Sequence, residues 1–363
     1  MPNTPRTWDL FCRLLDNFGD VGVSWRLAAD LAARGELVRL WVDNLDPLRF
    51  MAPQGHPGVE VLNWPADDAA TAWPEPGDVV VENFGCELPA GFVDAMTRRA
   101  KPPVWLNLEY LSAESYAERS HLLASPQRSG LPKWFYFPGF TPATGGLIRE
   151  PGLLERREAF DRDAWLGSLG IQRHPHEQVA LLFCYPNPAL ADTLQQLARQ
   201  GPTLLLLTPG HAQSQAHALQ AAGALPEALR LADLPWLTQA EFDHALWCAD
   251  INFIRGEDTW VRAIWGGAPF VWQLYPQEAE VRDTKLRAWL QRLCGGTPLE
   301  AELLALHRHY NTLPAPGADT PAAAPAGIPD TATWRSALLH WRGQLTQQPD
   351  LVSQLQAFVN RKS

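Results

Sequence analysis

The sequence predicts an α/β protein built from two similar halves. Apolar strand-like runs alternate with amphipathic helical segments from Trp8 to Glu109, and the alternation resumes from Val179 to Gln273. Runs such as Thr203–Thr208 (TLLLLT) are apolar throughout, which is typical of parallel strands covered by helices on both faces. Two such halves should enclose a cleft at the carboxyl ends of their strands, where open α/β sheets bind ligands.

The first half opens with a strand, a turn and a helix. An apolar run predicts the strand over Trp8–Leu15, and Asp16–Gly22 (DNFGDVG) predicts the turn. Val23–Arg34 has the apolar spacing of an amphipathic helix, which Gly35 ends. Further strands are expected at Glu36–Asp43, Val59–Asn63, Asp78–Glu82 and Val104–Glu109.

From Tyr110 to Gly152 the pattern is interrupted by aromatic, proline and glycine residues, so we expect ordered loops and a domain edge there. The strand and helix pattern then returns. Strands are expected at Val179–Tyr185, Thr203–Thr208, Leu229–Leu231, Asp250–Ile254 and Pro269–Gln273, and helices at Leu153–Leu169, Ala189–Arg199, Ala240–Cys248 and Thr259–Trp265.

We therefore predict two Rossmann-like domains, 1–155 and 156–340, and a C-terminal helix at 341–363 that packs back on the first domain. Residues 313–333 are rich in proline and alanine, which predicts a flexible surface insertion.

Length and composition agree with two globular domains. The chain has 363 residues, 46% of them hydrophobic and 19% charged, which excludes a disordered or fibrous protein. A net charge of -10 makes nucleic acid a poor partner but leaves room for a local basic pocket. The five scattered cysteines are expected to be buried free thiols of a reducing compartment. The sequence shows neither a leader pattern nor a membrane-spanning apolar window, so we expect a soluble cytoplasmic protein without a membrane partner.

The first candidate site is the turn Asp16–Gly22, at a position where nucleotide-binding folds hold phosphate. It lacks the G-x-G-x-x-G spacing and carries two carboxylates, Asp16 and Asp20. Carboxylates repel a pyrophosphate and instead hold a cationic group or take a proton from it, so we expect an acceptor site with a general base. The alternative is that Asp20 caps the helix and Gly19 only serves the turn.

The second candidate site is Ile254–Thr259 (IRGEDT), where a strand again runs into a helix. Gly256 permits a tight turn, Asp258 or Thr259 can cap the helix, and the free amides of the first turn form an anion seat. Arg255 adds a cation, so a diphosphate leaving group could be stabilised without a metal. The alternative is a structural ion pair between Arg255 and one of the carboxylates of this run.

The third candidate group gathers aromatic and polar residues near predicted strand ends. Aromatic rings there can stack on a nucleobase, and an amide can recognise its edge, although such residues are more often plain core. The group comprises Phe183, Tyr185, Leu237, Gln239, Phe253, Tyr275 and Gln277. The histidine pairs His174/His176 and His307/His309 lack zinc-ligand spacing, so no metal site is expected.

Three of these motifs together resemble a known family. Asp16–Leu27 (DNFGDVGVSWRL), Phe253–Ala263 (FIRGEDTWVRA) and Tyr275–Gln277 (YPQ) are closely similar to the bacterial protein-arginine rhamnosyltransferases that modify elongation factor P. The similarity spans nearly the whole chain and leaves out the segment 313–333. It implies a GT-B glycosyltransferase, in which two Rossmann-like domains face each other across the active-site cleft. The first domain would bind the acceptor and the second the nucleotide sugar.

The resemblance also implies a reaction. L-rhamnose would pass, with inversion, from dTDP-β-L-rhamnose to an arginine in the N-terminal domain of elongation factor P. A guanidinium has a pKa above about 12 and is a poor nucleophile, so it must be oriented and deprotonated as the bond forms. By the resemblance, Asp16, Asp20 and Glu257 are the catalytic carboxylates. Asp20 is then the general base, and Asp16 grips a second N–H of the guanidinium.

The donor-binding residues implied by the resemblance are Asn17, Phe18, Gly19, Phe183, Tyr185, Leu237, Gln239, Phe253, Arg255, Gly256, Asp258, Thr259, Tyr275 and Gln277. No metal and no other cofactor is expected.

Two other classes of function stay open at this point. A GT-B enzyme could use another nucleotide sugar on a glycan or lipid acceptor, and it would then act on a sugar rather than on a protein. A nucleotide-binding module without catalysis would bind its ligand regardless of the carboxylates. A nicotinamide oxidoreductase is disfavoured because acids stand where phosphate would lie.

Overall fold

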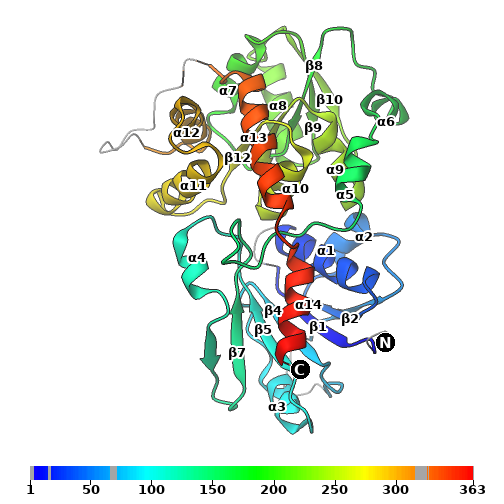
Figure 1. The fold of residues 1–363 in the computed structure, drawn as a ribbon. Helices are drawn as coiled ribbons and strands as arrows, with labels where there is room; N and C mark the ends of the chain where they lie inside the picture. The colour runs from blue at the N-terminus through cyan, green and yellow to red at the C-terminus, as the bar shows by residue number, and fades with distance from the viewer. Residues whose placement is uncertain (1–3, 15–17, 66–71, 315–324, 326, 363) are drawn as a thin grey trace. The chain divides into compact units, whose positions relative to one another are not determined.

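The computed structural model describes residues 4–14, 18–65, 72–314, 325 and 327–362. The chain divides into two compact units (Figure 1). Unit 1 consists of Met1–Pro151 and Gln347–Ser363, and unit 2 consists of Gly152–Thr346.

Unit 1 is built around a sheet whose central strands are fully buried. Its strands are β1 (Thr7–Cys12), β2 (Leu37–Val42), β3 (Val59–Asn63), β4 (Val79–Asn83), β5 (Val104–Leu108), β6 (Ala124–Pro126) and β7 (Pro132–Tyr136). Its helices are α1 (Gly19–Ala33), α2 (Asp46–Met51), α3 (Ala90–Arg98), α4 (Ser115–Ser120) and α14 (Leu351–Lys362).

Unit 2 repeats the alternation of strand and helix. Its strands are β8 (Gln178–Leu182), β9 (Thr203–Leu207), β10 (Leu229–Asp233), β11 (Ile251–Arg255) and β12 (Phe270–Gln273). Its helices are α5 (Leu153–Glu158), α6 (Arg162–Ser168), α7 (Leu190–Ala198), α8 (His211–Ala221), α9 (Gln239–Cys248), α10 (Glu257–Gly266), α11 (Ala279–Cys294), α12 (Pro298–Tyr310) and α13 (Thr331–Thr346).

The two sheets share one strand order. Sheet 1 runs β3-β2-β1-β4-β5-β7-β6 and sheet 2 runs β10-β9-β8-β11-β12, so in each the first strand lies between the second and the fourth. The strands are parallel except for β6, which pairs antiparallel with β7. This is the Rossmann order. Successive strands are added toward one side of the sheet and then toward the other, and the change falls between β1 and β4 in sheet 1 and between β8 and β11 in sheet 2. Ligands of such sheets bind outside the carboxyl ends of the strands at these switch points.

Alternate side chains of the strands build two cores on the faces of sheet 1. Trp8, Leu10 and Cys12 point to the face covered by α1, where the C-terminal helix α14 also packs. Phe11 points to the other face, among the rings of Trp41, Trp64 and Phe92. Because parallel strands must be covered on both faces, the last helix of the chain completes the core that its first strand begins.

Two local predictions from the sequence are wrong. The aromatic run inside Tyr110–Gly152, expected as loop, contains β7, which pairs with β5. Proline and glycine around it hid a strand that lies near the edge of the sheet, where proline is tolerated. The first strand was expected to reach Leu15 but ends at Cys12, and α1 begins at Gly19, four residues before the expected start.

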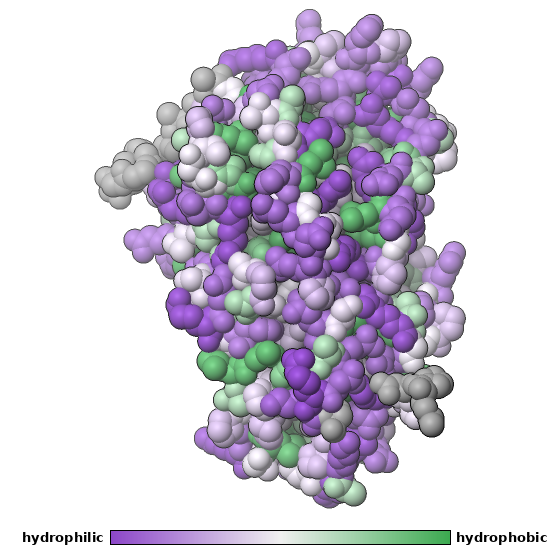
Figure 2. Space-filling view, viewed as in Figure 1, coloured by the Kyte–Doolittle hydropathy of each residue, from purple (hydrophilic) through white to green (hydrophobic). Residues whose placement is uncertain are grey.

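The face seen in Figure 2 is mostly hydrophilic, with apolar residues in small scattered groups. None of the helices in the described ranges is long and apolar enough to cross a bilayer. The five cysteines are buried and free, as expected.

Helix α14 supplies the first testable prediction. Phe358 is 2% exposed, and its ring meets those of Trp134 and Tyr136 edge to face at 5.6 and 6.2 Å. Replacing it with alanine should lower the free energy of unfolding of unit 1 by about 3–5 kcal/mol, because a cavity opens between helix and sheet. Urea denaturation followed by tryptophan fluorescence measures the loss. Phe358→Leu should cost less than about 1.5 kcal/mol, and equal losses for the two variants would contradict this account of the core.

Candidate active site

The loop after β1 leads into α1 and presents the first candidate residues. Asp16 and Asn17 lie outside the described residues. Phe18 is the N-cap residue of α1, and its ring packs edge to face on Phe50 of α2 at 5.3 Å. Gly19 is the first residue of the helix. The interpretation of Asp20 as the capping residue is wrong, because no side chain caps α1 and Asp20 lies inside its first turn.

Asp20 is a buried carboxylate at the switch point of sheet 1. Its side chain is 3% exposed, and its Oδ1 accepts a hydrogen bond from the Tyr110 hydroxyl at 3.3 Å. The backbone carbonyl of Asp20 accepts from the Ser24 hydroxyl at 2.8 Å, which helps to fix the first turn. The amino-terminal turn of a helix favours negative charge, so α1 stabilises the ionised carboxylate.

Tyr110 is a site residue that the sequence reasoning did not single out. It follows the carboxyl end of β5, and its ring stacks on Phe84 at 4.4 Å between centroids. Phe84 and Gly85 follow β4 with φ of 60° and 66°, a left-handed conformation that is unusual for phenylalanine. Strand ends of β1, β4 and β5 thus bring Asp20, Phe84 and Tyr110 together. Carboxyl-end position was the signal that could have found Tyr110.

Two other titratable groups lie at this edge of the sheet. Burial raises the pKa of the Cys12 thiol, and the charge of nearby Asp20 raises it further against a hydrogen bond to Ser24. Cys12 therefore stays protonated and is excluded as a nucleophile at neutral pH. Burial also raises the pKa of Glu109, next to Tyr110, against a hydrogen bond from Asn107 that lowers it.

In unit 2, β11 ends in Arg255 at the switch point of sheet 2. Its guanidinium carbon lies 4.5 Å from the ring centroid of Phe183 and 4.4 Å from that of Tyr185, the two aromatic residues that follow β8. Arg255 Nε is buried and has no hydrogen-bond partner within the described part of the chain. In that part the contacts of Arg255 are aromatic, not the ion pair that the sequence left as an alternative. A buried guanidinium nitrogen without a partner is costly to the free protein and well suited to an anion.

Helix α10 begins beside Arg255, and its N-cap residue is a glycine, which has no side chain to cap the first amides. The N-cap residue is Gly256, with φ 75°, so the expected capping by Asp258 or Thr259 is wrong. Glu257 and Asp258 lie in the first helical turn, and Thr259 is buried. The left-handed backbone explains the glycine, which lets the chain turn from β11 into α10. Together with Arg255, the first-turn amides form a cationic seat for an oxyanion.

The remaining predicted donor residues divide between this cluster and other places. Tyr275 is exposed and meets Tyr185 edge to face at 5.9 Å. Gln277 is exposed and accepts from Lys285 Nζ at 3.3 Å. Phe253 is fully buried against Tyr310, inside the core. Leu237 is half-buried before α9, and Gln239, the first residue of α9, is buried.

Gln273, the last residue of β12, holds the backbone next to the aromatic side of Arg255 in place. Its Oε1 accepts from the Tyr185 amide at 2.8 Å, and its Nε2 donates to the Pro186 carbonyl at 3.4 Å. These hydrogen bonds fix the backbone of Tyr185, whose ring contacts the Arg255 guanidinium. The sequence marked Gln273 only as a strand end. Groups of three or more His, Cys, Asp or Glu that could hold a metal are absent from the described ranges.

Comparison with known proteins identifies close relatives. The chain matches the family model for the Elongation-Factor P (EF-P) rhamnosyltransferase EarP over residues 8–360. A protein-arginine rhamnosyltransferase of Pseudomonas aeruginosa is 41% identical over 97% of this chain and 98% of its own length. Another, from Neisseria meningitidis serogroup B, is 35% identical over 99% of this chain and 98% of its own.

Solved structures agree with this assignment. The structure that describes EarP-mediated arginine glycosylation of translation elongation factor EF-P is 32% identical, has a TM-score of 0.66, and covers 99% of this chain and 100% of its own. The calicheamicin glycosyltransferase CalG4, at 15% identity and a TM-score of 0.54 over 99% of this chain and 100% of its own, shares the fold alone. These similarities confirm the predicted GT-B glycosyltransferase fold. The chain therefore belongs to the EarP family of EF-P rhamnosyltransferases and is, like its relatives, a protein-arginine rhamnosyltransferase.

Proposed function

We propose that this enzyme transfers L-rhamnose, with inversion, from dTDP-β-L-rhamnose to an arginine in the N-terminal domain of EF-P. The observation that carries the proposal is the opposite chemistry of the two switch points. Sheet 1 presents the buried carboxylate of Asp20, which suits a cationic acceptor. Sheet 2 presents the guanidinium of Arg255, whose Nε has no protein partner in the described residues and which suits an anionic donor. Because EF-P acts in translation, the proposal also assigns the reaction to the cytoplasm.

On the acceptor side, the carboxylate of Asp20 accepts a proton from the guanidinium as its nitrogen attacks the anomeric carbon. The bond from that carbon to the diphosphate oxygen breaks at the same time, and dTDP leaves with the electron pair. Asp20 is thus the general base, oriented by the Tyr110 hydroxyl, and Asp16 grips a second N–H of the acceptor. Holding the planar guanidinium at two points fixes the direction of attack.

On the donor side, Arg255 and the first-turn amides of α10 stabilise the charge that develops on the diphosphate. The Thr259 hydroxyl near the start of the same helix adds a further donor. Glu257 is the third catalytic carboxylate, and because its charge would repel the diphosphate, we assign it to the sugar or to the acceptor cation. Phe183, Tyr185 and Tyr275 offer ring faces and edges for thymine. Since oriented donors supply the positive charge, the mechanism requires no metal, and we expect turnover to survive EDTA.

Intact-mass spectrometry of EF-P incubated with the enzyme and dTDP-L-rhamnose tests the reaction. The expected product gains one deoxyhexose on an arginine. Asp20→Asn should reduce turnover about 10²- to 10⁴-fold, the usual contribution of a general base, while leaving dTDP binding unchanged. The matched control is Asp46→Asn, at a carboxylate that is 70% exposed on α2, and it should keep full activity. Near-normal turnover by Asp20→Asn would remove Asp20 from the mechanism.

Tyr110→Phe tests the orientation of the base. The variant keeps the ring stacked on Phe84 and loses only the hydrogen bond to Asp20, so kcat should fall about tenfold with little change in KM for the donor. The acidic limb of the pH–rate profile should move to higher pH, because the carboxylate then takes up a proton more readily. Tyr116→Phe, at an exposed tyrosine of α4, is the control. An unchanged pH profile would mean that Tyr110 is only a packing residue.

Arg255→Met separates binding from stability. Loss of charge-assisted bonds to the diphosphate should weaken dTDP binding by about 10- to 100-fold in calorimetry. The free energy of unfolding should stay the same or rise, because methionine still packs between the rings and no buried nitrogen is left without a partner.

Arg230→Met is the matched control for that experiment. Arg230 is partly exposed and pairs with the buried Glu177 at 2.7 Å. The control should lose stability and retain dTDP affinity, the reverse of the pattern expected for Arg255→Met. If Arg255→Met lost stability and still bound dTDP normally, the Arg255 guanidinium would have a structural role and would not contact the donor.

A further inference from the structure

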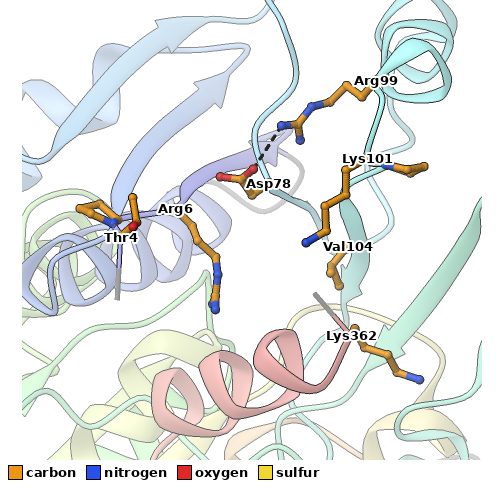
Figure 3. A pocket seen from close by; sticks show the side chains of 9 residues that line it. Thr4, Arg6, Asp78, Arg99, Lys101, Val104 and Lys362 are labelled. Atoms are coloured by element: carbon orange, nitrogen blue, oxygen red, sulfur yellow. Dashed lines mark hydrogen bonds and ion pairs between the residues drawn. The ribbon is translucent and has the colours of Figure 1, made fainter. Parts of the chain in front are cut away.

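A polar pocket lies in unit 1, at the amino-terminal edge of sheet 1. Its volume is about 350 Å³, and it is lined by Thr4, Pro5, Arg6, Asp78, Arg99, Lys101, Pro102, Val104 and Lys362 (Figure 3). These residues precede β1, β4 and β5, begin β5 or end α14, whereas Asp20 follows the carboxyl end of β1. The length of one strand, roughly 15–20 Å, therefore separates this pocket from the acceptor site.

The lining of this pocket is strongly cationic in a chain of net charge -10. Four lining residues carry positive charge and one, Asp78, carries negative charge. Asp78 is already engaged, because its Oδ1 accepts from Arg99 and its Oδ2 from the Thr7 amide, each at 3.1 Å. Partial burial raises the pKa of Asp78, but these hydrogen bonds and the charges of Arg99 and Arg6 lower it below its ordinary value. The carboxylate thus stays ionised and compensates Arg99, which also lies 3.5 Å from Glu75.

Neither Arg6 nor Lys101 forms an ion pair with a carboxylate in the described part of the chain, although the charge of Arg6 also acts on Asp78. The Arg6 guanidinium donates to the neutral amide oxygen of Asn360. Lys101 is exposed and has no ion pair there. In Figure 3 the side chains of Arg6 and Lys101 reach into the pocket from the segments before β1 and β5, whereas the Lys362 ammonium points away. That ammonium lies 3.8 Å from the centre of the Trp134 ring.

We propose that this pocket is a binding site for a small multivalent oxyanion, held by the Arg6 guanidinium and the Lys101 ammonium against a wall formed by Val104 and the neighbouring prolines. An arginine fork with a lysine point charge is the pairing that recognises phosphate and carboxylate oxygens. The volume is near the lower limit of small-molecule sites, about 300 Å³, so the ligand is smaller than a nucleotide sugar. The site is separate from the donor seat at Arg255, which belongs to unit 2.

Titrations of the full chain with pyrophosphate and with citrate, monitored by backbone amide NMR, test the site. At about 0.15 M salt, where exposed charges are screened, the amides of Thr7, Asp78 and Lys101 should shift and saturate. The amides of Gly256 and Glu257 report separately on any anion that enters the donor seat. Neither readout depends on rhamnosyl transfer, so failure of this site and failure of the proposed reaction are distinguishable.

Matched variants show which side chains contribute to the affinity for the anion. Lys101→Gln and Arg6→Gln should each weaken binding about tenfold, the effect of one charge-assisted hydrogen bond. Arg128→Gln removes the same charge from the exposed loop between β6 and β7 and should change the affinity less than about twofold.

Saturation by pyrophosphate alone would identify a phosphate ligand, and saturation by citrate alone would identify a carboxylate ligand. Absence of saturable shifts with both anions, or equal affinity in Lys101→Gln and the unmodified chain, would overturn the proposal.

Discussion

The position of the first strand in the middle of each sheet is the constraint on which the rest of the structure depends. Because β1 lies between β2 and β4, and β8 between β9 and β11, the connections on either side of these strands leave in opposite directions. The loops that follow them diverge and leave room for a ligand at the carboxyl edge. Asp20 follows the first of these strands, and Phe183 and Tyr185 follow the second. One rule of chain topology thus accounts for both groups of residues in the proposed reaction.

Both groups of site residues contain a feature that lowers the stability of the free protein. Phe84 adopts a left-handed backbone conformation, and Arg255 keeps a buried nitrogen without a partner among the described residues. Strain and unpaired polar atoms are tolerated where a scaffold determines the position and a ligand supplies the missing contact. The surrounding strands are apolar and fully buried, as in β9 with its run of leucines, and they supply that rigidity.

The sequence predicted the fold class and the approximate positions of the strands outside Tyr110–Gly152, because continuous apolar runs and helical periodicity are local properties. It predicted Arg255 and the pair Phe183 and Tyr185 as separate groups at strand ends, and the structure brings the three side chains into contact because carboxyl ends of neighbouring parallel strands converge. It missed β7, whose proline and glycine neighbours resemble a loop until pairing with β5 is seen. Capping by Asp258 or Thr259 was also wrong, because the choice of Gly256 depends on a backbone angle that composition does not reveal. Tyr110 could have been found from its position after β5, but its hydrogen bond to Asp20 is a tertiary contact that the sequence does not show. The catalytic roles remain predictions.

The return of α14 to unit 1 affects how the protein is made. Unit 1 is discontinuous, because the whole of Gly152–Thr346 is inserted between its two segments. A ribosome therefore completes every residue of unit 2 before it synthesises Leu355 and Phe358, which fill the α1 face of the first sheet. Unit 2 is complete before α14 is synthesised and can fold during translation, whereas the core between sheet 1 and α1 is completed only when α14 has been made. A nascent chain halted before residue 347 would contain strands β1 to β7 of unit 1 and still lack the helix that completes its core.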